Sequence, residues 1–325
     1  MPRELDEDDV RIRPPRSTRP RTKTRPGHAD SAEGLVVTVD RGRYRVRVEG
    51  LVLTCVRARE LGRRAVVVGD RVAVVGDLSG GPDALARVVR VEDRTSLLRR
   101  TPDDTDPLER PVVANAEILV VVTAIVDPVA RPRLIDRCLV AAFDGGLTPL
   151  LCLTKSDLAP ADDLLALYEP LGVEALVTGR GQSVDALRDR LQHRVSVLFG
   201  QSGVGKSTLV NQLVPDAFRA VGEVSGVGKG RHVSSSAIAL ELPGGGTVID
   251  TPGVRSFGLG AVTPARVLAA FPDLALAAEE CPPGCDHFSP GCALDGSGAT
   301  SARLVSYRRL LSSREGSATL DGDVA

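Results

Sequence analysis

The sequence predicts an α/β fold in which a P-loop domain with a doubly wound sheet follows a small OB-type β-barrel and precedes a cysteine-rich helical domain. Three features predict this organisation. Short strands with period-2 alternation fill residues 34–98; a strand, a glycine loop and a helix follow one another over residues 194–214; and residues 281–292 hold three cysteines and a histidine. With 325 residues, the chain is long enough for two or three domains with a sizeable core.

The composition narrows the functional class. A net charge of −1 gives no whole-molecule attraction to nucleic acid, and 3% aromatic residues without tryptophan argue against a stacking platform for single strands. We find no signal peptide and no apolar run that could cross a membrane, so we expect a cytoplasmic, monomeric protein without membrane partners. Its cysteines are then expected to be reduced rather than paired.

Basic residues gather at both ends of the chain. Residues 1–33 are expected to form a disordered arm, which carries Arg11, Arg13, Arg16, Arg19, Arg21, Lys23 and Arg25 without an intervening acid. A helix expected at 301–311 carries Arg303, Arg308 and Arg309. For both segments two interpretations stay open: a solvated surface, or a surface that contacts RNA phosphates.

Residues 34–98 are expected to form the OB-type barrel, with a turn at 40–43. Strands are expected at 35–39, 44–48, 51–56, 64–68, 72–75 and 86–91. Arg45 and Arg47 share the polar face of one strand, which is either an RNA-binding face or an ordinary solvated one.

The P-loop domain is expected to follow a polar linker at 93–110. Continuous apolar runs indicate strands that are buried on both faces of a parallel sheet, at 117–124, 149–153, 174–177 and 194–199. Helices are expected at 133–143, 160–168, 184–191 and 207–214. A hairpin is expected to pair 237–242 with 247–249.

Residues 200–207 fit G-x-x-x-x-G-K-[ST] between a strand and a helix. Backbone N–H groups and the positive end of a helix dipole then converge where a triphosphate would bind. Lys206 would reach the β- and γ-phosphates, and the Ser207 hydroxyl would ligate Mg²⁺, so both are assigned to catalysis. The predicted nucleotide-binding residues of this loop are Gly200, Ser202, Gly203, Val204, Gly205, Lys206, Ser207 and Thr208.

Two further polar segments follow apolar strands. Asp250 begins D-x-x-G and is expected to hold Mg²⁺, usually through water, while Gly253 would donate its N–H to the γ-phosphate. Thr154, Lys155 and Asp157 form T-K-x-D at the carboxyl end of a strand, where ligands bind in such sheets. Lys155 would pack on the base. The Asp157 carboxylate could accept two hydrogen bonds from guanine, and adenine offers no such donor pair.

A cysteine cluster near the C-terminus predicts a metal site. Three thiolates and an imidazole can form a closed tetrahedral Zn²⁺ site with a structural role, and the candidate ligands are Cys281, Cys285, His287 and Cys292. A reduced cluster without metal stays the alternative. The other cysteines are expected to be core residues: Cys55, Cys138 and Cys152.

The order of these segments is unusual, because GTPases normally run from the P-loop to the base-reading element. Here T-K-x-D comes first, a circular permutation that parallel sheets tolerate. The permuted order, the barrel before it and the cysteine cluster after it resemble the RsgA family of ribosome small-subunit-dependent GTPases over residues 34–312. The most specific segments are 200–207, 229–232, 250–253 and the cysteine cluster. The resemblance implies GTP hydrolysis stimulated by the 30S subunit and its 16S rRNA, and a role in late maturation of that subunit.

The resemblance also implies an arrangement for hydrolysis. Val254 stands where many GTPases carry a glutamine that orients water, so intrinsic hydrolysis is expected to be slow. His232 lies in a glycine-rich stretch, 224–232, that is expected to be a mobile loop. It would orient the attacking water once the ribosome orders that loop; a solvated loop histidine is the alternative.

The sequence departs from the family pattern at several positions. Thr154 replaces the usual asparagine, and residues 178–180 read Thr-Gly-Arg where a Ser-Ala loop normally touches the base. A serine run replaces the usual threonines at 233–236, so the switch hydroxyl for Mg²⁺ is Ser234 or Ser235. The two wider gaps in the cysteine cluster are each one residue shorter than in the family.

The expected domains are a basic arm at 1–33, the barrel at 34–98, a circularly permuted P-loop GTPase domain at 99–270 and a zinc-binding helical domain at 271–325. One alternative is a P-loop ATPase or kinase that acts on a small molecule. The other is an RNA-binding module with a degenerate nucleotide site. Asp157→Asn discriminates the first alternative, because only a GTPase would exchange a guanine for a xanthine preference.

Overall fold

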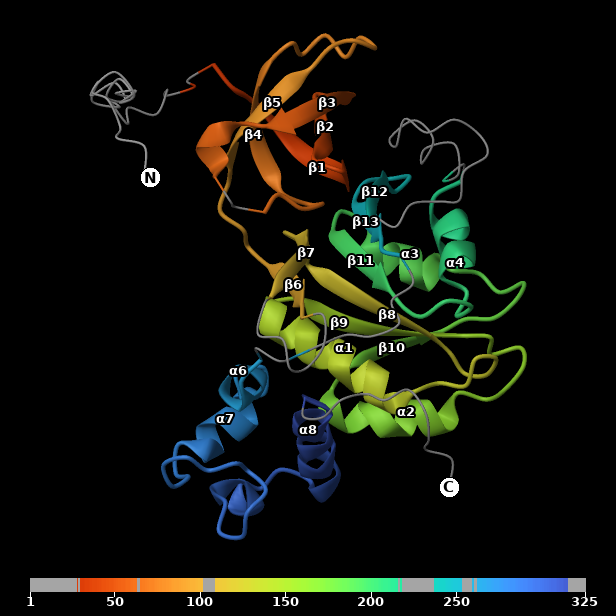
Figure 1. Cartoon of the computed structure of the whole chain (residues 1–325). Coiled ribbons are helices and arrows are strands. Elements are labelled where there is room, and N and C mark those ends of the chain that lie inside the picture. Colours follow the sequence, from red (N-terminus) through yellow and green to blue (C-terminus); the bar gives the residue numbers. More distant parts are fainter. Residues whose placement is uncertain are drawn as a thin grey trace, which may run out of the picture.

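The computed structural model describes residues 28, 30–62, 65–101, 109–215, 217, 237–252, 259 and 262–314. Its N-terminal part, red to orange in Figure 1, is a β-barrel that closes through pairing of β1 with β4. Its elements are β1 (Ala32–Asp40), β2 (Arg43–Val48), β3 (Leu51–Arg57), the 3-10 helix η2 (Arg59–Leu61), β4 (Arg71–Gly76) and β5 (Ala86–Val91). The barrel forms because alternate residues such as Val46, Leu53 and Val74 point into one apolar core.

The prediction of a strand at 64–68 is wrong. Among its described residues, only Val68 pairs, in an isolated bridge to Val113. The chain turns here instead, because the buried carboxylate of Asp70 accepts a hydrogen bond from the Val67 N–H and binds the guanidinium of Arg94.

The segment expected as a linker contains structure of its own. Within 93–110, β6 (Leu97–Arg100) pairs antiparallel with β7 (Arg110–Ala114). This hairpin forms because Leu98 and Val113 are buried in the core of the following domain. It places the barrel directly on that domain.

The central domain is a mainly parallel sheet with helices, coloured yellow to cyan in Figure 1. Its strands are β8 (Ile118–Ala124), β9 (Thr148–Thr154), β10 (Glu174–Val177), β11 (Val195–Phe199), β12 (Ile238–Glu241) and β13 (Thr247–Asp250). Its helical elements are α1 (Pro132–Gly145), α2 (Asp162–Tyr168), the 3-10 helix η3 (Glu169–Leu171), α3 (Asp185–Leu191) and α4 (Lys206–Leu213). The expected elements of this domain are therefore confirmed.

The strand order explains the composition of the strands. The sheet runs β10-β9-β8-β11-β13-β12 and continues into β1 of the barrel, where Thr38 pairs with Ile238. β8, β9, β10, β11 and β13 are parallel, and β12 is antiparallel to β13. β8 lies in the middle of the parallel strands, and each of its residues is buried.

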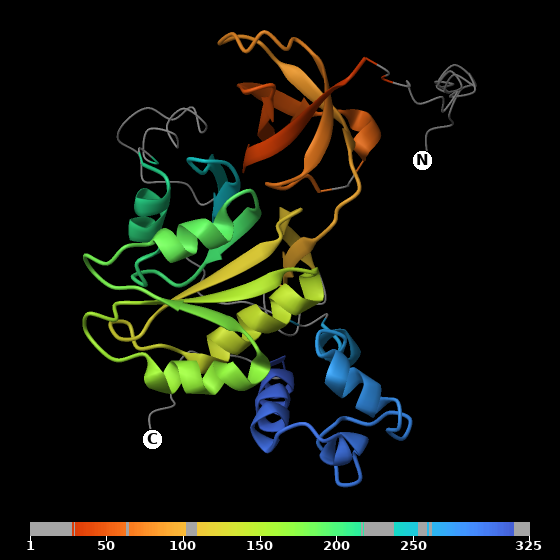
Figure 2. The same cartoon turned by 180° about the vertical axis from the view of Figure 1, so that it is seen from behind.

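The C-terminal region is helical and lies at the end of the sheet opposite the barrel (Figures 1 and 2). It contains α6 (Pro264–Leu268), α7 (Pro272–Ala278), the 3-10 helix η4 (Ala293–Gly296) and α8 (Ser301–Arg314). The helix expected at 301–311 is thus confirmed, whereas α6 and α7 were not expected. None of the helices in the described part of the chain has the length and apolar character needed to span a membrane.

Candidate active site and metal centre

The polar segments predicted from the sequence follow parallel strands at one edge of the sheet. T-K-x-D begins with Thr154, the last residue of β9, the P-loop follows β11, and Asp250 ends β13. β9 and β11 flank β8, and β11 pairs with β13. Because all four strands are parallel, the segments that follow them lie at the same edge.

The P-loop joins β11 to α4. Gly203 and Gly205 adopt left-handed φ angles of +84° and +89°, which favour glycine, and α4 begins directly after Gly205. Gly200 is required by close approach, because a Cβ there would lie 2.4 Å from the Val122 carbonyl oxygen. Of the other predicted residues, Val204 is buried, whereas Ser202, Ser207 and Thr208 are exposed at the mouth of the loop. The exposed hydroxyls are thus available to a ligand.

Lys206 and Asp250 meet at this edge. The Lys206 ammonium lies 2.5 Å from Asp250 Oδ1 and also donates to the carbonyl of Thr251. Lys206 is buried and Asp250 is partly exposed. The group predicted to bind phosphate and the carboxylate predicted to hold Mg²⁺ therefore face one point.

Thr251 is a site residue that the sequence analysis missed. Its side chain is buried, and its hydroxyl donates to the Leu198 carbonyl of β11 at 2.7 Å. This bond fixes the start of D-x-x-G beside the P-loop strand, and it sets the carbonyl that accepts from Lys206. A buried hydroxyl directly after a strand is the signal that could have found it.

Thr154 contacts the P-loop. Its buried hydroxyl lies 2.7 Å from the Val204 carbonyl oxygen and 3.2 Å from that of Thr123. A Cβ on Gly205 would lie 3.8 Å from Thr154. Thr154, at the end of β9, therefore stabilises the phosphate-binding loop through a hydrogen bond.

Lys155 is oriented by the loop that follows β8. Its ammonium donates to the carbonyl of Asp127 and lies 3.6 Å from the Asp127 carboxylate. Pro128, the next residue, lies beside Gly203 of the P-loop. Asp127 was missed because its contacts come from a different strand and leave no local pattern in the sequence.

Asp157 projects from the same edge into solvent. Its Oδ1 accepts a hydrogen bond from the Arg180 N–H at 2.8 Å. The segment after β10, which was noted for departing from the family pattern, therefore contacts the residue predicted to read the base.

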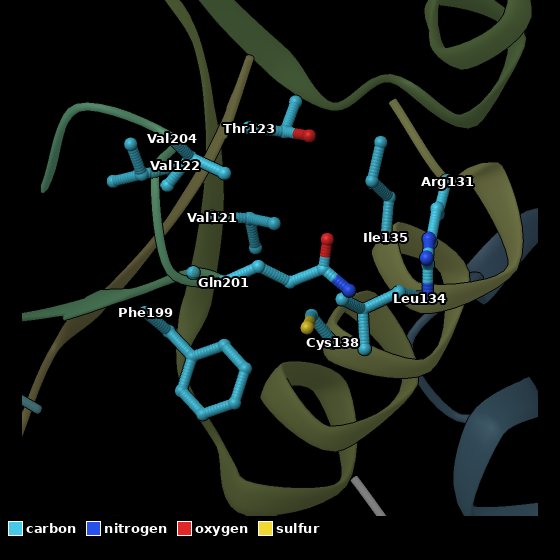
Figure 3. Close-up of a pocket in the computed structure, with 11 residues that line it drawn as sticks. Val121, Val122, Thr123, Arg131, Leu134, Ile135, Cys138, Phe199, Gln201 and Val204 are labelled. Carbon is cyan, nitrogen blue, oxygen red and sulfur yellow. The ribbon is translucent and has the colours of Figure 1, made fainter. Parts of the chain in front are cut away.

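A small, partly open pocket lies beside the P-loop, between β8 and the first turns of α1. Figure 3 shows the side chain of Gln201 extending from the P-loop towards Leu134 and Cys138 of α1. Arg131 lines the same pocket. The P-loop is thus in contact with α1 as well as with the neighbouring strands.

The cysteine cluster can hold a metal ion. The ligand atoms of Cys281, Cys285, His287 and Cys292 all lie within 4.8 Å of one another. Cys281 Sγ is 3.8 Å from both Cys292 Sγ and His287 Nδ1, and Cys292 Sγ is 3.7 Å from His287 Nδ1. Burial lowers the pKa of His287, which favours the neutral imidazole that metals bind. The other cysteines, Cys55, Cys138 and Cys152, are buried as expected.

The arginines of α8 are partly buried, and each of them binds a carboxylate. Arg303 binds Asp273 of α7, Arg308 binds Asp295, and Arg309 binds the buried Asp136 of α1. These ion pairs were not expected, because the carboxylate partners come from distant segments, and RNA contact by this helix stays a prediction. On the barrel, Arg45 donates to Thr54 and Arg47 pairs with Glu241 of β12.

Several predicted residues lie outside the described part of the chain. They are His232, Ser234, Ser235, Gly253, Val254 and most of the basic arm at 1–33.

Comparison with known proteins agrees with this arrangement. Residues 91–260 match the family model described as RsgA GTPase. The chain is 40% identical over 267 residues to the small ribosomal subunit biogenesis GTPase RsgA of Pseudomonas fluorescens strain SBW25, which covers 77% of this chain and 75% of the relative. It is 36% identical over 303 residues to the protein named small ribosomal subunit biogenesis GTPase RsgA 1 of Vibrio vulnificus strain YJ016, with 87% and 84% covered.

Solved structures agree in fold. YjeQ from Thermotoga maritima superposes with a TM-score of 0.64 at 24% identity, over 87% of this chain and 98% of that one. YloQ, described as a circularly permuted GTPase, gives a TM-score of 0.62 at 24% identity, over 89% and 96%. The permuted fold inferred from the order of the motifs is therefore confirmed.

Proposed function

The chain belongs to the RsgA family of GTPases, and from this premise we propose that it hydrolyses GTP in response to the 30S ribosomal subunit during late maturation of that subunit. The observation that carries the proposal is the bond from Thr154 to the Val204 carbonyl, at 2.7 Å. It joins the base-reading segment to the phosphate-binding loop, so guanine and triphosphate can be bound at one edge of the sheet. A P-loop ATPase or kinase, the alternative weighed from the sequence, gains no support from the family match.

We assign the phosphate end as follows. Lys206 binds the β- and γ-phosphates, and the N–H groups of Gly203, Val204 and Gly205 surround them. Asp250 and the Ser207 hydroxyl hold Mg²⁺, which neutralises charge on the phosphate oxygens. The closeness of Lys206 to Asp250 supports this, because both groups must contact the same phosphate–metal unit.

We assign the base to Asp157 and Lys155. The carboxylate of Asp157 accepts from guanine N1–H and N2–H, and the stem of Lys155 packs on the ring. Hydrolysis is assigned to water oriented by His232, with Gly253 on the γ-phosphate. The support for this part is the family match, which extends to residue 260.

We propose Zn²⁺ as the ion of the cysteine cluster. With Zn–S distances of about 2.3 Å, two sulfurs of a tetrahedral site lie about 3.8 Å apart. The separation of Cys281 Sγ and Cys292 Sγ is 3.8 Å, although the cluster is more closely spaced in sequence than in the family. Bound zinc would hold the loops around α7 and η4 together, a structural role. Chelation followed by measurement of metal content tests the stoichiometry.

We propose that 16S rRNA contacts the outward face of the barrel. Arg43 of β2 and Arg87 of β5 lie on either side of Val56, because both pair with it across β3. Both arginines are exposed, so they can meet phosphates. Arg43→Glu and Arg87→Glu should weaken 30S binding and reduce its salt dependence, whereas the control Arg194→Glu, an exposed arginine of the central domain, should not.

The decisive experiment measures phosphate release from GTP with and without purified 30S subunits. We expect strong stimulation by 30S in wild type and its loss in Lys206→Ala. Asp157→Asn should move the preference from GTP to xanthosine triphosphate, and the exposed control Asp189→Asn should not. Unstimulated wild type, or a Lys206→Ala variant as active as wild type, would contradict the proposal. We expect the protein to be cytoplasmic. We also expect the active species to be a monomer, which sedimentation can test.

A further inference from the structure

Arg308 of α8 contacts the cysteine cluster from outside. Its Nε donates to the backbone carbonyl of His287 at 2.7 Å, and its Nη2 donates to Asp295 Oδ1 at 2.8 Å. His287 is one candidate metal ligand. The Asp295 N–H donates to the carbonyl of Cys292, another candidate ligand, at 3.0 Å. One guanidinium therefore connects two segments that each carry a ligand.

The carbonyl that accepts from Arg308 belongs to a residue in an unusual backbone conformation. His287 has a φ of +64°, in the left-handed region that residues with a Cβ rarely adopt. Such a conformation costs free energy and persists where its surroundings stabilise it. The His287 N–H donates to Cys285 Sγ at 3.4 Å, and Arg308 binds the carbonyl, so both backbone polar groups of His287 are bound. In this conformation the imidazole Nδ1 lies 3.7 Å from Cys292 Sγ.

The charge of Arg308 complements a site with three thiolates. A divalent ion bound by three thiolates and a neutral imidazole keeps one excess negative charge, because the thiolates outweigh the two positive charges of the ion. Burial opposes the charge of Arg308, yet hydrogen bonds and charge from Asp295 and from the Cys292 sulfur raise its pKa. The Arg308 side chain is only 24% exposed, so solvent screens its charge less than on an open surface. The guanidinium thus lies where it can stabilise the negative charge of the loaded site.

We propose that Arg308 is a positioning residue of the metal centre, which retains the ion by holding the His287 backbone and by compensating the excess negative charge of the thiolates. This inference rests on the zinc site proposed above. Groups that bind metal ligands from outside orient them and stabilise the bound ion, and their loss typically lowers metal affinity by about 10- to 100-fold. Without this contribution, zinc affinity would depend on the four ligands alone and would be independent of α8.

Arg303 offers a matched comparison on the same helix. Its guanidinium binds both oxygens of Asp273 and the Pro170 carbonyl, and its side chain is 25% exposed. It therefore makes the same kinds of contact as Arg308, but to residues that are not candidate ligands. Loss of either arginine should weaken the packing of α8, whereas only loss of Arg308 should weaken metal binding.

The test is the Zn²⁺ affinity of the full chain, measured by competition with a chromophoric chelator. We expect Arg308→Met to bind zinc about tenfold or more weakly than wild type, and Arg303→Met to bind it within about twofold of wild type. An Arg308→Met variant with wild-type affinity, or an equal loss in Arg303→Met, would overturn this inference alone. Wild type that binds no zinc would overturn the proposed metal and this inference with it.

Arg308→Lys separates the charge from the hydrogen bonds. Lysine keeps the positive charge, but it lacks the planar fork that binds the His287 carbonyl and Asp295 together. We expect its zinc affinity to lie between those of wild type and Arg308→Met. An affinity as low as that of Arg308→Met would overturn the charge compensation. Because it keeps the charge, Arg308→Lys also tests the inference if Arg308→Met does not fold.

Discussion

The barrel and the C-terminal helices are attached to opposite ends of the same GTPase sheet by different chemistry. The barrel is held mainly through main-chain groups and one amide side chain, beside one exposed ion pair between Arg47 and Glu241. Asn115 donates to the Gly69 carbonyl at 2.9 Å and accepts from the Thr95 N–H at 2.9 Å, and the Ala114 N–H donates to the Val68 carbonyl at 3.0 Å. These are neutral hydrogen bonds with a fixed register.

The C-terminal helices are held through guanidinium groups. Arg309 of α8 binds both oxygens of Asp136 at 3.0 and 3.2 Å, and its charged end lies 5.0 Å from the centre of the Tyr168 ring. Arg303 reaches the Pro170 carbonyl of η3 at 2.9 Å. Burial raises the pKa of Asp136 more than Arg309 lowers it, so this pair forms against a desolvation cost.

The difference between these two kinds of contact indicates which substitutions should weaken each attachment. An attachment made of backbone hydrogen bonds requires the two main chains to lie close together, and its stability depends little on charge. A joint made of a buried ion pair is costly to break from one side, because the remaining charge is left without a partner. Substitutions at the barrel contact should therefore lower stability through steric clashes, and substitutions in α8 should lower it by leaving a charge unpaired.

The largest effect is expected for Arg309→Met. It leaves the buried Asp136 unpaired and should lower the free energy of unfolding by about 3–5 kcal/mol, measured by urea denaturation with metal present. Arg188→Ala breaks an ion pair with the exposed Asp185 and should cost less than about 1 kcal/mol. Equal losses in the two variants would contradict the buried-pair account.

The pH dependence of the same variant sharpens this prediction. A carboxyl whose pKa is higher in the folded than in the unfolded chain loses stability as pH rises through its folded pKa. Removal of Arg309 raises the pKa of Asp136 further, so the deficit of Arg309→Met should grow from acidic towards neutral pH. The double variant with Asp136→Asn should recover part of the loss and show no such growth.

The next effect is expected for Gly69→Ala at the barrel. Gly69 has a φ of +88°, and a Cβ there would lie 2.0 Å from the Ala114 carbonyl oxygen. We expect a loss of about 2–3 kcal/mol from backbone strain and the clash together. Gly42→Ala has a similar φ of +82° with nothing within 4 Å, so it should report the strain alone, about 1 kcal/mol. Matching values for the two variants would show that close approach is unimportant.

A smaller effect is expected for Asn115→Ala. It removes the acceptor for the Thr95 N–H and the donor for the Gly69 carbonyl, and should cost about 1–2 kcal/mol in urea denaturation. Asn115 has a φ of +56°, so Asn115→Gly separates the two causes. It keeps the backbone conformation and still loses the amide bonds. A glycine variant as stable as wild type would show that the amide is dispensable.

The smallest effect is expected for Glu241→Gln, at the contact between β12 and the barrel. Glu241 lies 2.5 Å from Arg47, but its side chain is 65% exposed, so solvent screens the pair. We expect a loss of at most about 0.5 kcal/mol, below that of Asn115→Ala in the same assay. A larger loss would mean that charge also contributes to this joint.

Local sequence patterns predicted most of the strands and helices and the convergence of the nucleotide motifs. Buried runs such as β8 are recognisable because both faces are covered, and the P-loop is recognisable because phosphate binding needs glycines and a lysine at fixed spacing. The hairpin of β6 and β7 was missed because Leu98 and Val113 gain their burial from a domain that follows later in the chain.

The remaining errors also concern partners that are distant in sequence. Arg309 looked like a surface residue because Asp136 precedes it by most of the central domain. Asp127 was not predicted as the partner of Lys155, because it follows a different strand of the sheet. Side chains whose role depends on a tertiary contact carry no periodic signal, so sequence patterns alone could not assign them.

Arg308 and Arg309 are consecutive residues of α8, pointing about 100° apart around its axis. Arg308 donates to the backbone carbonyl of the candidate metal ligand His287 at 2.7 Å, while Arg309 holds Asp136. A single turn of helix thus bridges the cysteine cluster and the first helix of the catalytic domain. We therefore expect the cysteine cluster and the GTPase domain to unfold together, in a single thermal transition.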